Sequence, residues 1–319
     1  LNGSFDYYLK YTKDILMKPG YVATLGEGAG MWLNGADIRN RGFELSLNYQ
    51  NNIGTVGTNI GVVLAHNKQR IIKVPDVVIN NFAGDGKDDN ILGRSRNSLY
   101  GYIADGLFQT QEEIDNAPAQ VGAAPGRIRY RDINGPDGKP DGKIDNYDRT
   151  WIGVQDPKLE YGFNIGLTWK NFDFNLFFNG ILGKDLNVQS WKSWTIYSLG
   201  TVGENYDVRL LDAWTPTNTG SKIPAISVNN YNEENRFSTY YVESGAYLKI
   251  RNAELGYTFS KALLNTIKTS SLRAYLRCDN ILTIKKSRGK NAYTGLDPET
   301  PGTSYPLPFS ITAGIKLTL

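Results

Sequence analysis

Two adjacent segments, residues 159–170 and 171–182, alternate strictly between apolar and polar positions. The first carries Leu, Tyr, Phe, Ile, Leu and Trp at its odd positions, with Glu, Gly, Asn, Gly, Thr and Lys between them. The second resumes the alternation with Phe or Leu at the even positions from Phe172 to Phe178. A period of two predicts a strand whose two faces meet different surroundings. An aromatic face opposite a polar one is typical of a membrane β-hairpin, with lipid outside and water inside.

Four further segments repeat this pattern. In each of them the charged residues fall on the polar face, because a Lys or Arg facing lipid near mid-membrane would cost ~2–4 kcal/mol. Strands of ~10–12 residues at ~3.3 Å each, tilted by ~40°, cover an apolar band of about 25 Å. The four segments are 43–49, 56–64, 272–279 and 309–319.

Residues 244–259 follow the pattern only in part. Ala253, Leu255, Tyr257 and Phe259 fit a lipid-facing row, but Lys249 and Arg251 share their parity. Two explanations stay open: this end of the strand rises above the membrane, or a β-bulge resets the register.

The connections between the predicted strands fall into two length classes. Outer-membrane barrels keep short turns on the periplasmic side and long loops outside. Applied here, that rule predicts about eight strands that alternate in direction and a periplasmic C-terminus. The strand-like stretches 99–110 and 127–131 then form an external hairpin. The short connections are 50–55, 170–171 and 260–270, and the long ones are 14–37, 71–157, 183–243 and 284–305.

Composition narrows the class of protein without naming it. The 319 residues have a mean hydropathy of −0.40, and no run reaches the ~18–20 apolar residues of a transmembrane helix, which excludes a helical membrane protein but not a barrel. A net charge of +3 is too small to indicate nucleic-acid binding. With one cysteine, Cys278, and one histidine, His66, we expect no disulfide framework and no enzyme. The chain starts at Leu1 without an initiator Met or a signal peptide, so we expect a processed protein or a fragment.

An acidic loop, 132–148, has the spacing of an EF-hand-like cation site. Hard cations such as Ca²⁺ and Mg²⁺ take several oxygen ligands around a sharp glycine turn. One register starts at Asp137 and places Lys139, which cannot be a ligand, at the third position. The other starts at Asp132 and Asn134 and treats 136–140 as an insertion; it is favoured because it supplies an oxygen at every expected place. The predicted metal residues are Asp132, Asn134, Asp137, Asp141, the Lys143 carbonyl, Asp145 and Asp148.

The alternative for this loop is a solvated turn rich in Asp, Gly and Pro. No Glu closes the loop, and the shorter Asp148 predicts a modest affinity. We expect a structural Ca²⁺ or Mg²⁺, because closely packed carboxylates repel one another unless a cation neutralises them.

Several motifs in order along the chain resemble the C-terminal third of SusC/RagA-type TonB-dependent transporters of the Bacteroidota outer membrane. Together they cover nearly the whole of residues 1–319. The motifs are IRNRGFE at 38–44, GYIADGLF at 101–108 with QEEI at 111–114, the acidic loop, YGFN at 161–164, LKIRN at 248–252 with LGY at 255–257, and DNIL at 279–282.

The resemblance implies a barrel of about 22 strands filled by an N-terminal plug, of which this chain supplies about the last eight. It further implies a SusD-like surface lipoprotein as partner, TonB acting on the plug, and an oligosaccharide or a peptide as cargo. Oligosaccharide import is the favoured reading. One departure is Leu319, because the family usually ends in an aromatic residue.

The long loop 183–243 carries the candidate substrate contacts Trp191, Trp194 and Tyr197, whose rings would stack on sugars. The alternative, which we favour, is that such aromatics pack the loop against itself or against a protein partner. Charges on the predicted lumen face are expected to form a solvated wall or salt bridges to the plug that the resemblance implies, rather than to contact substrate. These are Glu44, Asp173, Arg273 and Arg277.

Two other classes of protein stay open. The first is a complete eight-stranded barrel acting as an adhesin or small pore, whose interior its own side chains would fill. The second is a soluble carbohydrate-binding or hydrolytic β-protein.

Overall fold

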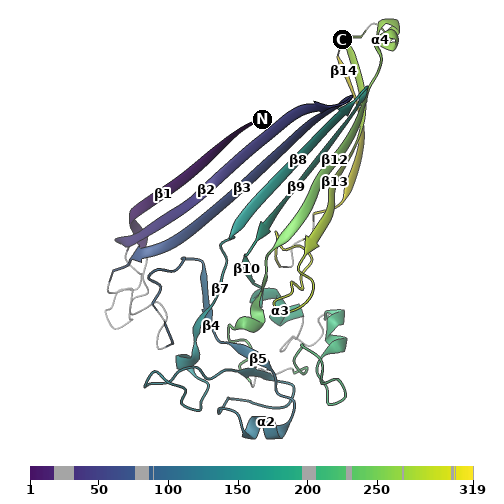
Figure 1. Ribbon diagram of the computed structural model, residues 1–319. Coiled ribbons are helices and arrows are strands. Elements are labelled where there is room, and N and C mark those ends of the chain that lie inside the picture. The colour runs from purple at the N-terminus through teal and green to yellow at the C-terminus, as the bar shows by residue number, and fades with distance from the viewer. Residues whose placement is uncertain are drawn as a thin grey trace.

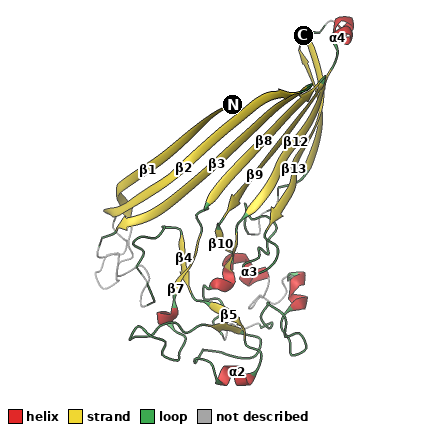
Figure 2. Ribbon diagram, viewed as in Figure 1, coloured by secondary structure: helices red, strands yellow, loops and turns green. Residues whose placement is uncertain are grey.

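One large antiparallel sheet dominates the computed structural model (Figures 1 and 2). The described residues are 1–17, 32–75, 86–88, 90–195, 206–227, 232–267, 269–302, 305 and 307–318. The eight strands of the sheet are β1 (Asn2–Met17), β2 (Leu33–Ile53), β3 (Val56–Lys73), β8 (Leu159–Trp169), β9 (Phe172–Leu182), β12 (Tyr247–Thr258), β13 (Ser271–Lys285) and β14 (Ser310–Thr318).

The strands lie side by side in chain order, and every neighbouring pair is antiparallel. The predicted number of strands and their alternating direction are therefore confirmed. β1 and β14 stand at the two edges of an open sheet (Figure 1). Over the described residues the sheet does not close into the small barrel that one alternative required.

Short and long connections separate to opposite ends of the sheet, as the sequence predicted. Gly54-Thr55 and Lys170-Asn171 make tight turns, and both Gly54 and Lys170 adopt positive φ angles (63° and 54°). The third short connection carries the helix α4 (Lys261–Ile267) at the end where both termini lie (Figure 1). No helix among the described residues is long and apolar enough to cross a membrane.

The long connections gather at the other end into a small folded unit, which we call the loop region (residues 86–158, 183–246 and 286–302, as far as described). The predicted external hairpin is present outside the large sheet, because β5 pairs with β6. The strands of the loop region are β4 (Ser98–Gly101), β5 (Ala104–Leu107), β6 (Ile128–Tyr130), β7 (Thr150–Val154), β10 (Asp185–Asn187) and β11 (Val242–Ser244). Its helical segments are α2 (Gln111–Asp115), η2 (Asn146–Asp148), α3 (Gln189–Thr195), η3 (Val208–Asp212) and η4 (Thr239–Tyr241).

One face of the large sheet carries aromatic rings in cross-strand contact. Phe163 on β8 stacks on Phe178 of β9, with ring centroids 4.9 Å apart. Near the short turns, Phe172 lies 6.5 Å from Trp169 and 4.9 Å from Tyr257. A row of aromatics at this level matches the interfacial girdle of an outer-membrane barrel.

The opposite face carries charges that pair within the sheet. Arg273 on β13 donates hydrogen bonds to Asp173 on β9 and to Glu254 on β12, the latter over 2.7 Å. It reaches β9 by passing over Gly256, where an added Cβ would lie 2.3 Å from the guanidinium. Arg273 and Asp173 therefore find their partners within the wall, which the sequence analysis did not predict.

The irregular strand 247–258 contains a β-bulge. Against β9 the register shifts between Ile250 and Asn252 and leaves Arg251 as the extra residue. Against β13 the shift has the opposite sense, because Arg251 stands opposite two residues, Asn280 and Ile281. Ile250 then pairs with Phe178 on the apolar face, and Lys249 pairs with Asn179 on the polar face. The bulge explanation is confirmed, and it keeps Lys249 away from the apolar face.

Candidate functional site

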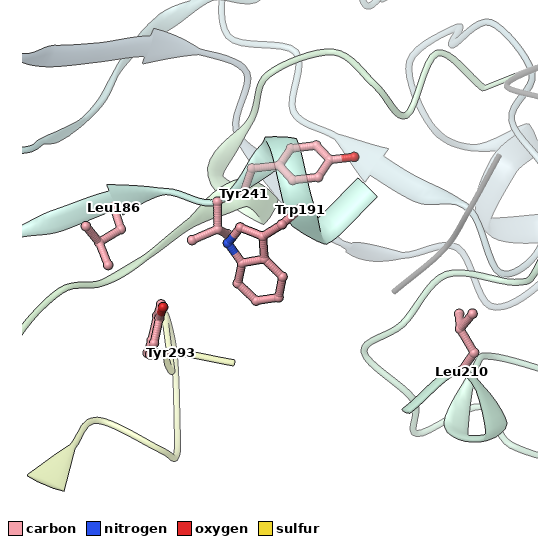
Figure 3. Packing of buried hydrophobic residues seen from close by; sticks show 6 residues of the cluster. Leu186, Trp191, Leu210, Tyr241 and Tyr293 are labelled. Atoms are coloured by element: carbon pink, nitrogen blue, oxygen red, sulfur yellow. The ribbon is translucent and has the colours of Figure 1, made fainter. Parts of the chain in front are cut away.

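A hydrophobic cluster holds the loop region together (Figure 3). Trp191 from α3 is only 6% exposed, and its ring meets Tyr293 edge-on at 6.4 Å between centroids. The segments that supply the cluster lie up to about a hundred residues apart in the chain, so it fixes two long connections, 183–246 and 286–302, to each other. Its buried members are Leu186, Val188, Trp191, Leu210, Tyr241 and Tyr293.

The burial of Trp191 bears on the predicted substrate contacts. A ring with so little exposed surface has no free face for a sugar, so the structure favours the packing alternative for this residue. Trp214 behaves similarly, at 7% exposure in a second cluster with Ile128 and Tyr130. The side chain of Trp194 and all of Tyr197 lie outside the described residues, and their role stays a prediction.

A cavity of about 800 Å³ opens beside this cluster. Cations outnumber acids in its lining, and Glu243 is the one acidic residue there among the described residues. Apolar surface comes mainly from Leu107, Ile223, Tyr240 and Val242. The cations are Lys192, Arg209, Lys222, Arg288 and Lys290.

Two of these cations are engaged in structural ion pairs. Lys192 donates to Glu243 over 2.9 Å and to the Tyr240 carbonyl over 2.8 Å. Burial lowers the pKa of Lys192, and the Glu243 carboxylate opposes part of that change. Arg209 is held by Asp207, whose pKa this hydrogen bond lowers.

The other three cations of the cavity, Lys222, Arg288 and Lys290, have exposed side chains. The structure shows no ion pair from them to any described acidic residue. The cavity can therefore accept a ligand that carries carboxylate or sulfate groups. Sequence reasoning took Arg288-Gly289-Lys290 for an ordinary polar turn, and the only signal in the chain was the closeness of these two cations.

A cluster of charges attaches the loop 286–302 to β12 near its first residues, at the end that adjoins the loop region. Lys249 donates to Asp297 over 2.6 Å and to Glu299 over 2.7 Å, and Arg251 also donates to Glu299. The bulge at Arg251 lets both cations meet the same loop. The hydrogen bond from Arg251 lowers the pKa of Glu299 from 4.5 to about 2, with further help from Lys249 against the effect of burial.

This shift predicts an acid-sensitive attachment of the loop. Because the folded-state pKa of Glu299 is below that of a free carboxyl, its stabilisation is present above pH 4.5 and is lost as the pH falls toward about 2. Over that interval, the protection of residues 294–302 against hydrogen exchange, relative to the intrinsic exchange rate at each pH, should fall. In Glu299→Gln, the protection of residues 294–302 should be low at all pH values. A variant whose protection fell with pH as it does in wild type would contradict the attribution to Glu299.

The acidic loop 132–148 is organised around the fully buried Asp148. Its carboxylate accepts hydrogen bonds from the backbone N–H groups of Ile133 (2.8 Å), Asn134 (3.2 Å) and Asp145 (2.9 Å). Burial raises the pKa of Asp148, and these three hydrogen bonds oppose the rise. Asp148 therefore ties the two ends of the predicted metal loop together.

The other predicted ligands are arranged more openly. Asp132 accepts a hydrogen bond from the Gly142 N–H over 2.7 Å through one carboxylate oxygen. Its other oxygen is buried and has no hydrogen-bond partner, as expected for an atom that faces a cation. Asp137 and Asp141 are exposed, and no three acidic, His or Cys side chains converge in the described part of the chain. The donor chemistry suits Ca²⁺, but the exposed carboxylates would have to turn inward.

Comparisons with known proteins point to one class. TonB-dependent receptor P3 of Formosa agariphila is 30% identical over 93% of this chain and 28% of the receptor. TonB-dependent receptor P26 of the same organism is 27% identical over 98% of this chain and 32% of that receptor. TonB-dependent receptor SusC of Bacteroides thetaiotaomicron is 22% identical over 99% of this chain and 30% of that receptor. No protein-family model matches the chain.

Solved structures show the same fold. The RagAB peptide transporter superimposes with a TM-score of 0.75 at 22% identity, covering 99% of this chain and 33% of the matched chain. The closed-closed state of the RagAB peptide importer gives a TM-score of 0.74 at 23% identity, with the same coverage.

The antiparallel sheet has the fold of the RagAB structures, and curated relatives named as TonB-dependent receptors match the chain over 93% to 99% of its length. The chain is a homologue of the SusC/RagA type over nearly its whole length. It spans about 28% to 34% of the length of the curated relatives it matches. Those relatives are receptors and not enzymes, in agreement with the expectation from the sequence.

Proposed function

We propose that this chain forms part of the barrel wall of an outer-membrane transporter that imports oligosaccharides in a TonB-dependent manner. The observation that carries the proposal is the eight-stranded sheet, which has an aromatic face suited to lipid and a charged, internally paired face suited to water. The homology to TonB-dependent receptors over most of the chain supports it.

The arrangement of the connections supports an orientation. If the short turns are periplasmic, the C-terminus is periplasmic as well and the loop region faces outward. There it would meet a SusD-like surface lipoprotein that delivers the cargo. TonB would act on a plug formed by residues outside this chain.

The cavity of the loop region supports the choice of cargo. Its apolar lining with Tyr240, its hydroxyl groups from Ser221 and Thr239, and its three exposed cations, which form no ion pair with a described acidic residue, suit an oligosaccharide that carries acidic groups. Peptides are the second candidate, because the structural neighbours bear the name of a peptide transporter.

Uptake in the source bacterium tests the proposal. Cells lacking the protein should fail to take up fluorescent oligosaccharides that wild-type cells import, and cells lacking TonB activity should fail in the same way. Fluorescent peptides of equal size serve as the matched probe. Loss of peptide uptake alone would replace oligosaccharide by peptide, and unchanged uptake of both would contradict import.

We also propose that the acidic loop binds a structural Ca²⁺. The unpartnered buried oxygen of Asp132 and the spacing of the carboxylates along residues 132–148 support this. Mg²⁺ is the less favoured occupant, because it demands a tighter octahedral shell.

Calcium removal should destabilise the loop region. Ca²⁺ at about 100-fold its Kd should add about 2.7 kcal/mol of stability, so chelation should lower the melting temperature measurably. Asp137→Asn with Asp141→Asn should abolish the response, whereas Asp115→Asn, on the exposed end of α2, should keep it. A melting temperature independent of Ca²⁺ would contradict the metal site.

A further inference from the structure

Four cations lie together on the outer end of β2 and β3. Arg39 is directly opposite Arg70, and Arg41 is directly opposite Lys68. The four side chains are exposed or half-buried. Like charges directly opposite each other on neighbouring strands are destabilising, so the sheet carries two adjacent unfavourable pairs.

These cations point to the apolar, lipid-facing side of the sheet. The pairing of β2 with β3 runs without a shift from Ile38 to Ile53. Arg39 and Arg41 therefore share a face with Phe43, and Lys68 and Arg70 share it with Leu64. They are the exception to the rule that charges in this wall lie on the polar face.

The height of the four cations fits the edge of the membrane. From Val56 to His66, β3 advances ten residues, or ~33 Å of strand. His66 and its partner Phe43 on β2 form the last pair on this face before the cations. Tilted by ~40°, that length spans about 25 Å, the full height of the apolar band. Lys68 and Arg70 then follow directly above the hydrocarbon, at the level of the lipid headgroups.

No protein group neutralises these charges in the described part of the chain. On the β1 side, Arg39 and Arg41 are opposite Tyr11 and Leu9, which carry no charge. On the other side, β8 begins at Leu159, below the cations, and its Glu160 is opposite Ala65 on the polar face. The structure records no ion pair from any of the four to a described acidic residue.

We infer that Arg39, Arg41, Lys68 and Arg70 form a binding site for the phosphate groups of a glycolipid in the outer leaflet. Three guanidinium groups supply forked donors to phosphate oxygens, and two anionic phosphates would offset the like-charge pairs. The apolar face below the site would contact the acyl chains of the same lipid. This inference rests on the proposed outer-membrane orientation, with the loop region outside.

Lipid binding by the intact detergent-extracted protein tests the inference. The protein would be reconstituted with a phosphorylated outer-leaflet glycolipid or with the same glycolipid after phosphatase treatment. Native mass spectrometry would count the bound glycolipid. Wild-type protein should retain the phosphorylated form at least about tenfold better, and added salt should weaken the retention.

Two matched variants decide the outcome. Replacing Arg39, Arg41, Lys68 and Arg70 by Gln should remove the phosphate preference without lowering the melting temperature in detergent, because the substitutions relieve repulsion. Replacing four exposed cations of the loop region, Arg96, Arg131, Lys139 and Lys286, by Gln removes the same charge and should leave the preference intact. An equal preference in both variants would overturn the inference while leaving import untouched. A protein absent from the outer-membrane fraction would overturn the proposed function and, with it, this site.

Discussion

Trp191→Ala should destabilise the loop region by about 3–5 kcal/mol, the cost of removing a large aromatic ring from a packed cluster. Trp191 is almost fully buried in a cluster with Leu186, Tyr241 and Tyr293, so an alanine side chain would leave a cavity there. The free energy of unfolding, measured by denaturant titration with a probe in the loop region, gives the result directly.

A pair of adjacent leucines controls for side-chain size. Leu210 belongs to the same cluster, whereas Leu211 is 88% exposed. Leu210→Ala should cost about 2–5 kcal/mol, and Leu211→Ala should stay within about 0.5 kcal/mol of wild type. If Trp191→Ala left stability unchanged and weakened oligosaccharide binding, the ring would be a substrate contact after all.

Leu176→Arg should cost about 2–4 kcal/mol of folding stability in a bilayer. Leu176 lies at the middle of β9, between Ile165 and Ala253 on the apolar face. An arginine there would have to enter hydrocarbon without a partner. Folding into lipid vesicles, followed by the heat-dependent shift in electrophoretic mobility of a folded barrel, measures the effect.

The neighbouring residue supplies the matched control. Asn175 occupies the next position on β9 and faces the polar side. Asn175→Arg introduces the same side chain and should leave vesicle insertion within about 1 kcal/mol of wild type, because it remains in water. Equal costs for the two variants would show that the faces do not differ in solvent.

Most of the wall was predictable because alternation and turn length are local signals. The segments from Leu159 to Leu182 became β8 and β9 at the residues where the pattern begins and ends. At 247–258 the sequence pattern itself showed an irregularity, because Lys249 and Arg251 fall at apolar positions. This indicated either a strand end above the membrane or a β-bulge, and the structure contains the bulge. β2 and β3 were harder to delimit, because β2 begins at Leu33 and β3 ends at Lys73, in stretches where alternation does not separate charged from apolar residues.

The candidate site was predictable only in part, because its residues meet across long stretches of chain. Glu243 binds Lys192 and Thr294, each about fifty residues away, and no spacing in the sequence indicates this meeting. The acidic loop was found because all its residues lie within one segment. For Trp191, residue type suggested stacking, whereas the burial of its ring depends on contacts that no local pattern encodes.

The central claim is that one face of this sheet meets lipid and the other meets water. Single cysteines at Leu176 and Asn175, in a Cys278→Ala background and labelled with an environment-sensitive fluorophore, test it in vesicles that contain brominated lipid. The account predicts strong quenching by the lipid at position 176, and quenching only by aqueous iodide at position 175. Equal quenching by lipid at both positions, or the reverse order, would contradict it.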